Sequence, residues 1–452
     1  MLLVRPRPDK ETIGLQHVMV CEPLELEYLV SNVPEDLQSK VEVEIVDMIL
    51  EKESYECILT RTRPALVVFT GYITHVGLIK RMSSTAKSLL PGVLTGVGGV
   101  HAEVVGMDFL SEDIDFVYSR NGIDGFNITL SGMLENKMTE EIKASLGEMG
   151  EKKRSFAYKQ PDRKSVSKYR QGYYYMFHSP CALIKTSYGC PYNCSFCFCK
   201  EITDGTYFTR DLEDVVEELA AIPEKEIYIV DDDFLFNTER IRKFLRLLQE
   251  RGIKKNFLVY GRADFVAAQE DVLREFKKQG LQAVIVGIES IRAGDLEQYN
   301  KKTDKEMNEK AIQVLKKLDI ELYATLILPT DFDRVDFKEL TAWLRKLNVR
   351  FVNLQPLTPL RGTGIFEQYS DQFLYPRERY EMWDMAHVIL EPQGMGIRAF
   401  YWEIVKAYYR IIMRPKHILA LVKKYGVRQN LKMLLGSSAV SLQYLMKVMR
   451  GY

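Results

Sequence analysis

The chain has 452 residues, of which 46% are hydrophobic and 27% are charged, with 62 basic residues against 62 acidic ones. This length exceeds that of one typical core, so we expect two or three domains. A formal net charge of zero excludes the global basic field of many nucleic-acid-binding proteins, and nucleic acid is therefore not an expected partner.

The N-terminal residues MLLVRPRPDK lack the long apolar core of a secretion signal, and no apolar stretch is long enough to span a bilayer. We therefore expect a cytoplasmic protein. Seven cysteines are present, and four of them lie between positions 190 and 199. An odd number with so tight a cluster is unlike a secreted disulfide framework and is typical of metal binding in a reducing compartment.

Residues 1–134 alternate strand and helix patterns, with a helix expected over 74–90. The expected strands are rich in Val, Ile and Leu and cover 1–6, 41–49, 65–72, 92–99 and 115–122. This pattern predicts a doubly wound parallel sheet, an α/β fold. Ligands of such sheets bind beyond the carboxyl ends of the strands. The candidate positions there are Thr70, Gly71, Gly98, Gly99 and His101.

A polar segment, 135–179, is expected to link this domain to a second alternating series over 180–375. The strands expected in that series cover 182–190, 226–234, 256–264, 281–290, 320–329 and 349–359. Six strand–helix units predict a partial (β/α)6 barrel, whose strand ends converge on one face. Residues 376–452 contain no clear strand and are expected to form a helical cap.

Three cysteines follow the first strand of the second series with the spacing C-x3-C-x2-C, at Cys190, Cys194 and Cys197. Three thiolates on one short loop can cap three irons of a [4Fe-4S] cubane and leave the fourth iron without a protein ligand. An open iron is what chelation and reduction of a small molecule require.

The alternative is a structural zinc site or a set of buried free thiols. Zinc requires a fourth ligand at comparable spacing, and Cys199 is the candidate. Cys197 would then have to splay unfavourably, so we interpret Cys199 as a packed or neighbouring thiol.

Over residues 180–360 the sequence resembles the radical S-adenosylmethionine (SAM) superfamily, whose motif has an aromatic residue before its last cysteine, as Phe196 is here. The resemblance implies a cluster loop after the first barrel strand. It also implies that the free iron chelates the amino and carboxylate groups of SAM. One electron then cleaves the carbon–sulfur bond and releases a 5′-deoxyadenosyl radical.

Further cofactor contacts are implied by position in the superfamily. Asp232, in the run 231–233, stands where the family contacts the methionine amino group, although the usual Gly-Gly-Glu is absent. Arg262 is expected to pair with the methionine carboxylate, and Glu289-Ser290 resembles the segment that holds the ribose or carboxylate. Pro329 ends the strand where relatives pack the adenine. Strand-end or helix-cap roles are the alternative for the polar residues.

The first domain resembles that of the cobalamin-binding radical SAM enzymes, which include methyltransferases and the anaerobic cyclase of bacteriochlorophyll synthesis. The resemblance implies that Gly71, Gly98 and Gly99 let the backbone approach cobalamin, with Thr70 and Thr95 donating to its tail. His101 is a candidate contact, but the Asp-x-His-x-x-Gly signature of histidine-ligated cobalamin is missing. The alternatives are a scaffold domain without a ligand, or one that binds part of the substrate.

The C-terminal region is strongly basic. Ten Lys and Arg residues lie between positions 406 and 450. Glu403 is the only acidic residue after position 400. Basic amphipathic helices of this kind can rest on an anionic membrane surface, so contact with a membrane periphery is one reading. A helical cap with a solvated basic face is the other.

Together these features predict a cobalamin-dependent radical C-methyltransferase acting on an unactivated carbon of a small, lipophilic metabolite. The family resemblance implies an electron donor such as flavodoxin or ferredoxin. Two alternatives remain: a non-methylating radical SAM enzyme, such as a cyclase or a rearrangement enzyme, and an iron–sulfur scaffold or regulator without turnover.

Overall fold

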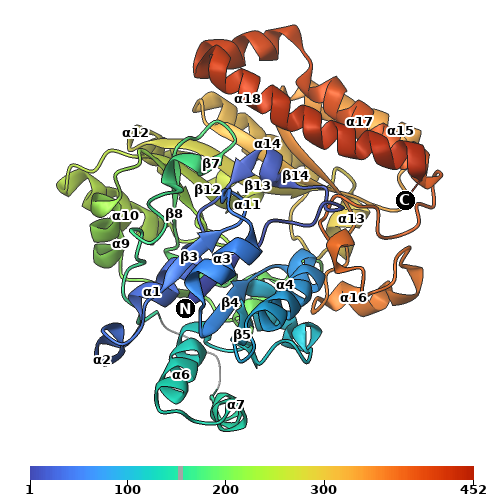
Figure 1. Ribbon diagram of the computed structural model, residues 1–452. Helices are drawn as coiled ribbons and strands as arrows, with labels where there is room; N and C mark the ends of the chain where they lie inside the picture. Colours follow the sequence, from blue (N-terminus) through green and yellow to red (C-terminus); the bar gives the residue numbers. More distant parts are fainter. Residues whose placement is uncertain (151–155, 452) are drawn as a thin grey trace.

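The computed structural model describes residues 1–150 and 156–451, and it is built on two parallel β-sheets with two long helices along one side (Figure 1). The first sheet has the order β3-β1-β4-β5-β6, and all its pairs are parallel. Its strands are β1 (Leu2–Arg5), β3 (Glu44–Asp47), β4 (Leu66–Thr70), β5 (Leu94–Gly98) and β6 (Phe116–Val117).

Helices cover both faces of the first sheet because successive side chains of a strand point to opposite faces. Leu3 and Val68 join one core with α1 and α6, whereas Leu2 and Phe69 join another with α3 and α4. The predicted doubly wound sheet is confirmed. The helices of this region are α1 (Leu24–Ser31), α2 (Glu35–Gln38), α3 (Tyr55–Thr62), α4 (Val76–Leu89), α5 (Val100–Val105), α6 (Gly122–Leu134) and α7 (Thr139–Gly147).

The second sheet has six parallel strands in the order β15-β14-β13-β12-β11-β8. Its two edge strands, β8 and β15, do not pair with each other in the described part of the chain, so the predicted partial barrel is confirmed. The strands are β8 (Cys181–Ile184), β11 (Glu226–Ile229), β12 (Asn256–Arg262), β13 (Leu281–Glu289), β14 (Glu321–Leu328) and β15 (Phe351–Pro356).

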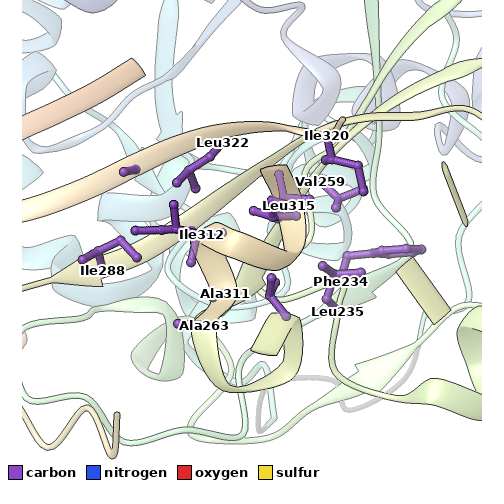
Figure 2. Close-up of a cluster of buried hydrophobic side chains, with 14 of the residues drawn as sticks. Phe234, Leu235, Val259, Ala263, Ile288, Ala311, Ile312, Leu315, Ile320 and Leu322 are labelled. Atoms are coloured by element: carbon purple, nitrogen blue, oxygen red, sulfur yellow. The ribbon is translucent and has the colours of Figure 1, made fainter. Parts of the chain in front are cut away.

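A hydrophobic core joins the outer face of this barrel to its helices, and Figure 2 shows part of it. Val259 and Leu322 come from strands, while Ile312 and Leu315 come from α14. The helices around the barrel are α8 (Cys199–Ile202), α9 (Leu212–Ala221), α10 (Thr238–Glu250), α11 (Ala263–Ala268), α12 (Glu270–Lys278), α13 (Ala293–Gln298), α14 (Lys305–Lys317), α15 (Arg334–Lys346) and α16 (Gly364–Gln368).

The inner face of the barrel is filled by side chains from the segment that precedes it. Tyr175 and Phe177 pack against Tyr228, Tyr323 and other inward residues. Tyr175 belongs to β7 (Tyr174–Tyr175), which pairs with β2 (Met19–Val20). The predicted linker therefore includes α7 and a segment that plugs the barrel. The predicted boundaries at 134, 179 and 375 stay predictions.

The chain ends in two helices, α17 (Ile397–Ile412) and α18 (Pro415–Arg450), which pack against each other. Gly426 has φ 76° and ψ 169°, which kinks α18 into two helical halves. Among the described residues, no helix combines the length and the apolar character needed to cross a membrane.

Removal of the Phe276 ring tests the barrel core. Phe276 is fully buried and contacts Phe234, Phe244 and Phe257. We expect Phe276→Ala to lower the free energy of unfolding by about 3–5 kcal/mol, because it leaves a cavity. Phe236→Ala, at a partly exposed phenylalanine, should cost less than about 1 kcal/mol. Urea unfolding followed by circular dichroism measures both, and equal losses would contradict this packing.

His75 predicts a pH dependence of stability. It is buried after β4, its Nδ1 accepts a hydrogen bond from the Tyr72 backbone N–H, and desolvation lowers its pKa to about 4. Below about pH 6.5 His75 becomes protonated in the unfolded chain, whereas in the folded chain it stays neutral until the pH approaches about 4. The free energy of unfolding should therefore fall by up to roughly 3 kcal/mol between about pH 6.5 and 4. His75→Gln should lose this part of the slope, and an unchanged slope would refute the assignment.

Candidate functional site

The three-cysteine loop lies at the carboxyl end of β8, an edge strand of the barrel. It follows the short strand β9 (Ser187–Tyr188), which pairs with β10 (Phe208–Thr209), and it leads into α8. Gly189 begins the loop at φ 76°, and a Cβ there would lie 2.0 Å from the carbonyl oxygen of Thr206. Only glycine fits this entry, so its position in the sequence has a steric cause.

Two of the three aspartates after β11 hold the loop in place. Asp231 is buried and accepts hydrogen bonds from the Thr186 backbone N–H at 2.6 Å and from the Thr186 and Ser187 hydroxyls at 2.6 and 2.7 Å. Asp232, predicted as a cofactor contact, accepts from the Gly189 N–H at 3.1 Å and lies 3.6 Å from Lys185 Nζ. Both carboxylates therefore tie the start of the loop to the neighbouring strand.

The third aspartate, Asp233, differs from its neighbours. It is buried, and neither carboxylate oxygen has a hydrogen-bond partner among the residues that the structure describes. Burial raises the pKa of its carboxyl to about 7, although the positive charge of Arg262 opposes the rise. A buried carboxyl without a partner is costly, so this group is suited to receiving a donor from a ligand. The prediction selected Asp232 from the run and passed over Asp233.

Two buried cations flank Cys194. The Arg262 Nη1 lies 3.9 Å from Cys194 Sγ, and Nη2 donates to the Lys301 carbonyl at 2.7 Å. Its guanidinium lies 3.7 Å from the centre of the Tyr192 ring. Burial raises the pKa of Cys194, whereas the charges of Lys301 and Arg262 lower it. These cations favour an anionic group bound to the loop.

Cys199 faces Cys197 rather than acting apart from it. A hydrogen bond between the two thiols lowers the pKa of Cys197 and raises that of Cys199. In the described residues, no three His, Cys, Asp or Glu side chains converge as one metal ion requires. A cubane does not need such convergence, because each thiolate binds a different iron. The donor set therefore fits a cluster.

Glu289 lies at the carboxyl end of β13, where the pairing with β14 shifts register. It has φ 59° and forms a buried ion pair with Lys301, 2.8 Å from Oε1 to Nζ. A Cβ on Gly287 would lie 2.1 Å from Glu289 Oε1 and 2.7 Å from Lys301 Nζ, so glycine makes room for this pair. Lys301 was not predicted as a site residue, because nothing in the pair Lys301-Lys302 distinguishes it from a surface lysine in the sequence.

The remaining barrel candidates are close to the same strand ends. Ser290 is buried and donates to Asp295 Oδ2 at 2.5 Å, and Pro329 follows the last residue of β14. Phe196 packs edge to face against Tyr299, with ring centres 5.6 Å apart. The structure therefore brings the predicted barrel candidates to one rim, where the polar side chains of Asp232, Arg262, Glu289 and Ser290 already have partners within the protein.

In the first sheet, four of the six candidates meet at the carboxyl ends of β4 and β5. Gly99 has φ 97°, and a Cβ there would lie 2.8 Å from Thr70 Oγ1 and 3.0 Å from the Gly71 nitrogen. The backbone therefore forms a close, side-chain-free turn beside Thr70, Gly71 and Gly98. Thr70 also donates to Glu25 at 2.9 Å.

The side chains of the other two candidates, Thr95 and His101, are paired with other parts of the protein. Thr95 is near the start of β5, buried, and donates to the Asp113 carbonyl at 2.5 Å. His101 is buried in α5 and lies 2.8 Å from Asp108, which also pairs with Arg361 at 2.7 Å. The structure therefore does not bring Thr95 to the strand ends, and it engages His101 in a contact between α5 and the segment after β15.

The carboxyl ends of the two sheets lie close to each other. Tyr72, after β4, is 60% exposed and Tyr260, in β12, is 36% exposed, yet desolvation raises the pKa of both. Tyr260 lies near enough to Tyr72 for its charge to contribute to the raised pKa of Tyr72. Helix α5 also contacts α8, directly after the cysteine loop. The glycine turn and the cysteine loop thus lie near each other.

The family model of the Radical SAM superfamily matches residues 184–344. The hopanoid C-3 methylase of Methylococcus capsulatus is 29% identical over 364 residues, which cover 79% of this chain and 70% of that protein. The anaerobic magnesium-protoporphyrin IX monomethyl ester cyclase of Rubrivivax gelatinosus is 22% identical, over 78% of this chain and 67% of the cyclase.

Two solved structures share the whole arrangement. The cobalamin-bound radical SAM methyltransferase TsrM from Kitasatospora setae matches with a TM-score of 0.66 at 16% identity, over 97% of this chain and 98% of its own. The cobalamin-dependent SAM radical enzyme OxsB matches with a TM-score of 0.67 at 14% identity, over 99% and 80%. Residues 184–344 therefore form a radical SAM domain, and the chain as a whole has the fold of the cobalamin-dependent radical SAM enzymes.

Proposed function

We propose that this chain is a radical SAM enzyme that methylates an unactivated carbon of a small, lipophilic metabolite with the help of cobalamin. One observation carries the proposal. The three-cysteine loop of a region that matches the Radical SAM superfamily lies near the glycine turn of a doubly wound sheet, because α5 and α8, which follow the turn and the loop, contact each other. The methylases and cyclases among its relatives act on hopanoid or tetrapyrrole compounds, which supports the substrate class.

Cys190, Cys194 and Cys197 are the proposed ligands of a [4Fe-4S] cluster. When bound, the cluster and SAM supply a 5′-deoxyadenosyl radical for hydrogen abstraction. The protein contributes charge and position. Arg262 and Lys301 place positive charge beside Cys194, and Asp231 and Asp232 fix the loop entry.

The SAM contacts follow from the same rim. We propose that the carboxylate of Asp233, rather than that of Asp232, accepts a hydrogen bond from the methionine amino group of SAM. The Asp233 carboxylate is the one without a hydrogen-bond partner among the described residues. We propose that the rest of SAM contacts Glu289, Ser290, Pro329 and Phe196. Arg262 remains a proposed partner of the SAM carboxylate.

Thr70, Gly71, Gly98 and Gly99 are the proposed cobalamin contacts, since the turn they form lets a large flat ligand approach the backbone. Cobalamin supplies a methyl group when bound. Thr95 and His101 stay in the proposal only as more distant candidates, because both side chains are already paired.

A radical SAM enzyme needs one electron per cleavage, and we propose a flavodoxin or ferredoxin as the donor. We also propose peripheral contact with a membrane through the basic C-terminal helices. The similarity to the cyclases supports a second candidate function, a radical ring closure without methyl transfer.

Replacement of the cysteines tests the cluster. Cys190→Ala, Cys194→Ala and Cys197→Ala should each abolish formation of 5′-deoxyadenosine from SAM after anaerobic reconstitution and reduction with dithionite, since each removes a cluster ligand. Cys199→Ala should keep the cluster and at least about a tenth of the rate, because it acts through one hydrogen bond to Cys197. Iron content and liquid chromatography give the readouts. Loss only in Cys199→Ala would overturn the ligand assignment.

The choice between the aspartates is testable by SAM binding. Asp233→Asn should weaken SAM binding by about 10- to 100-fold, the loss expected for one hydrogen bond to a charged group, while iron content stays normal. Asp232→Asn should instead lower iron content, because it loosens the Gly189 entry. Equilibrium dialysis with labelled SAM on iron-replete protein measures the first effect. Normal SAM binding by Asp233→Asn would refute its role.

A further inference from the structure

The outer face of α18 carries an apolar stripe that the protein core does not use. Its residues recur at helical spacing in the half of the helix after Gly426, and each is between 51% and 71% exposed; they are Val427, Leu431, Leu434, Leu435, Leu442 and Met449. Exposed leucines scattered singly are ordinary, but a continuous stripe of this kind marks an interaction surface.

The opposite face of the same helix is the one that packs on the protein. Met433 and Tyr444 are buried there, and a Cβ on Gly436 would lie 2.0 Å from the His17 carbonyl oxygen. Lys432 rests over the Tyr174 ring at 3.2 Å. The helix is therefore fixed by its inner face, so the apolar stripe has a defined outward direction.

A shallow apolar groove adjoins the stripe, between α17 and α18. It is lined by Trp402, Tyr409 and Leu445, with Lys406 and Arg410 at its rim. Trp402 and Tyr409 are 45% and 49% exposed. Half-exposed Trp and Tyr beside Lys and Arg are typical of the boundary between lipid headgroups and acyl chains.

The net charge of α17 and α18 indicates which kind of partner binds this surface. From Ile397 to Arg450 there are 11 Lys and Arg residues and one acid, Glu403. Lys416, Lys423 and Arg428 are exposed along α18. A second copy of the chain would bring like charges together, which costs free energy. An anionic bilayer satisfies both the charges and the apolar stripe.

From this geometry we infer that α17 and α18 lie in the plane of an anionic membrane, with the leucine stripe of α18 inserted below the headgroups. The helices run side by side along one edge of the molecule, so both can meet a flat surface (Figure 1). This inference deepens the proposed function, since it names the place where a lipophilic substrate would be met.

Vesicle flotation of the full chain tests the inference. The chain should float with vesicles of phosphatidylcholine and phosphatidylglycerol, but only weakly with phosphatidylcholine alone. Leu431→Ser/Leu435→Ser/Leu442→Ser should weaken binding at least about tenfold, because apolar burial is lost. Lys416→Gln/Lys423→Gln/Arg428→Gln should weaken only the anionic preference, by about fivefold for each charge removed. Leu89→Ser/Leu110→Ser/Met138→Ser, exposed apolar residues elsewhere, should bind like the wild type.

Two outcomes would overturn the inference. One is wild-type protein that fails to float with anionic vesicles. The other is sedimentation as a dimer that the leucine triple variant converts to a monomer, which would assign the stripe to a second copy. Formation of 5′-deoxyadenosine is measured in parallel without vesicles. Vesicle binding without that product would contradict the proposed radical chemistry and leave the membrane contact standing, whereas the product without vesicle binding would contradict the membrane contact and leave the proposed chemistry standing.

Discussion

The position of one loop depends on buried carboxylates that hold its first residues. Asp231 receives three hydrogen bonds from Thr186 and Ser187, and Asp232 receives the N–H of Gly189. A buried carboxylate is tolerated only where such donors surround it. The loop therefore leaves β8 in a fixed direction, with Cys194 buried and Cys190 and Cys197 partly buried.

Buried charged side chains also surround the loop. Arg262 and Lys301 stand beside Cys194, and Glu289 balances Lys301. Gly287 exists in this place because any side chain would strike that ion pair. Asp233 completes the rim as a buried acid without a partner among the described residues. The rim thus combines two cations near Cys194 with one buried carboxyl that has no partner among the described residues, and the proposed cluster and SAM contacts rest on this arrangement.

Much of this was predictable from sequence because the signals are local. Strands rich in Val, Ile and Leu at regular intervals predict both sheets, and the spacing of Cys190, Cys194 and Cys197 predicts the loop. The unpartnered state of Asp233 was not predictable, because three consecutive aspartates differ only in which neighbour each side chain meets. Lys301 lies outside any motif, and its burial arises from tertiary packing. Thr95 stays a prediction, and the structure places it near the start of β5 rather than at the end where Gly98 lies. The packing of Tyr175 and Phe177 inside the barrel was also not predictable, because it arises from tertiary contacts of residues in a polar segment.

The central claim is that three thiols of one loop hold a cubane with an iron open to SAM. Electron paramagnetic resonance of the reduced protein, with SAM labelled at its amino nitrogen, tests it most directly. We predict a signal typical of a reduced [4Fe-4S] cluster whose shape changes on addition of SAM, with hyperfine coupling from the labelled nitrogen. A cluster signal that SAM leaves unaltered, or zinc in place of iron in the reconstituted protein, would contradict the account.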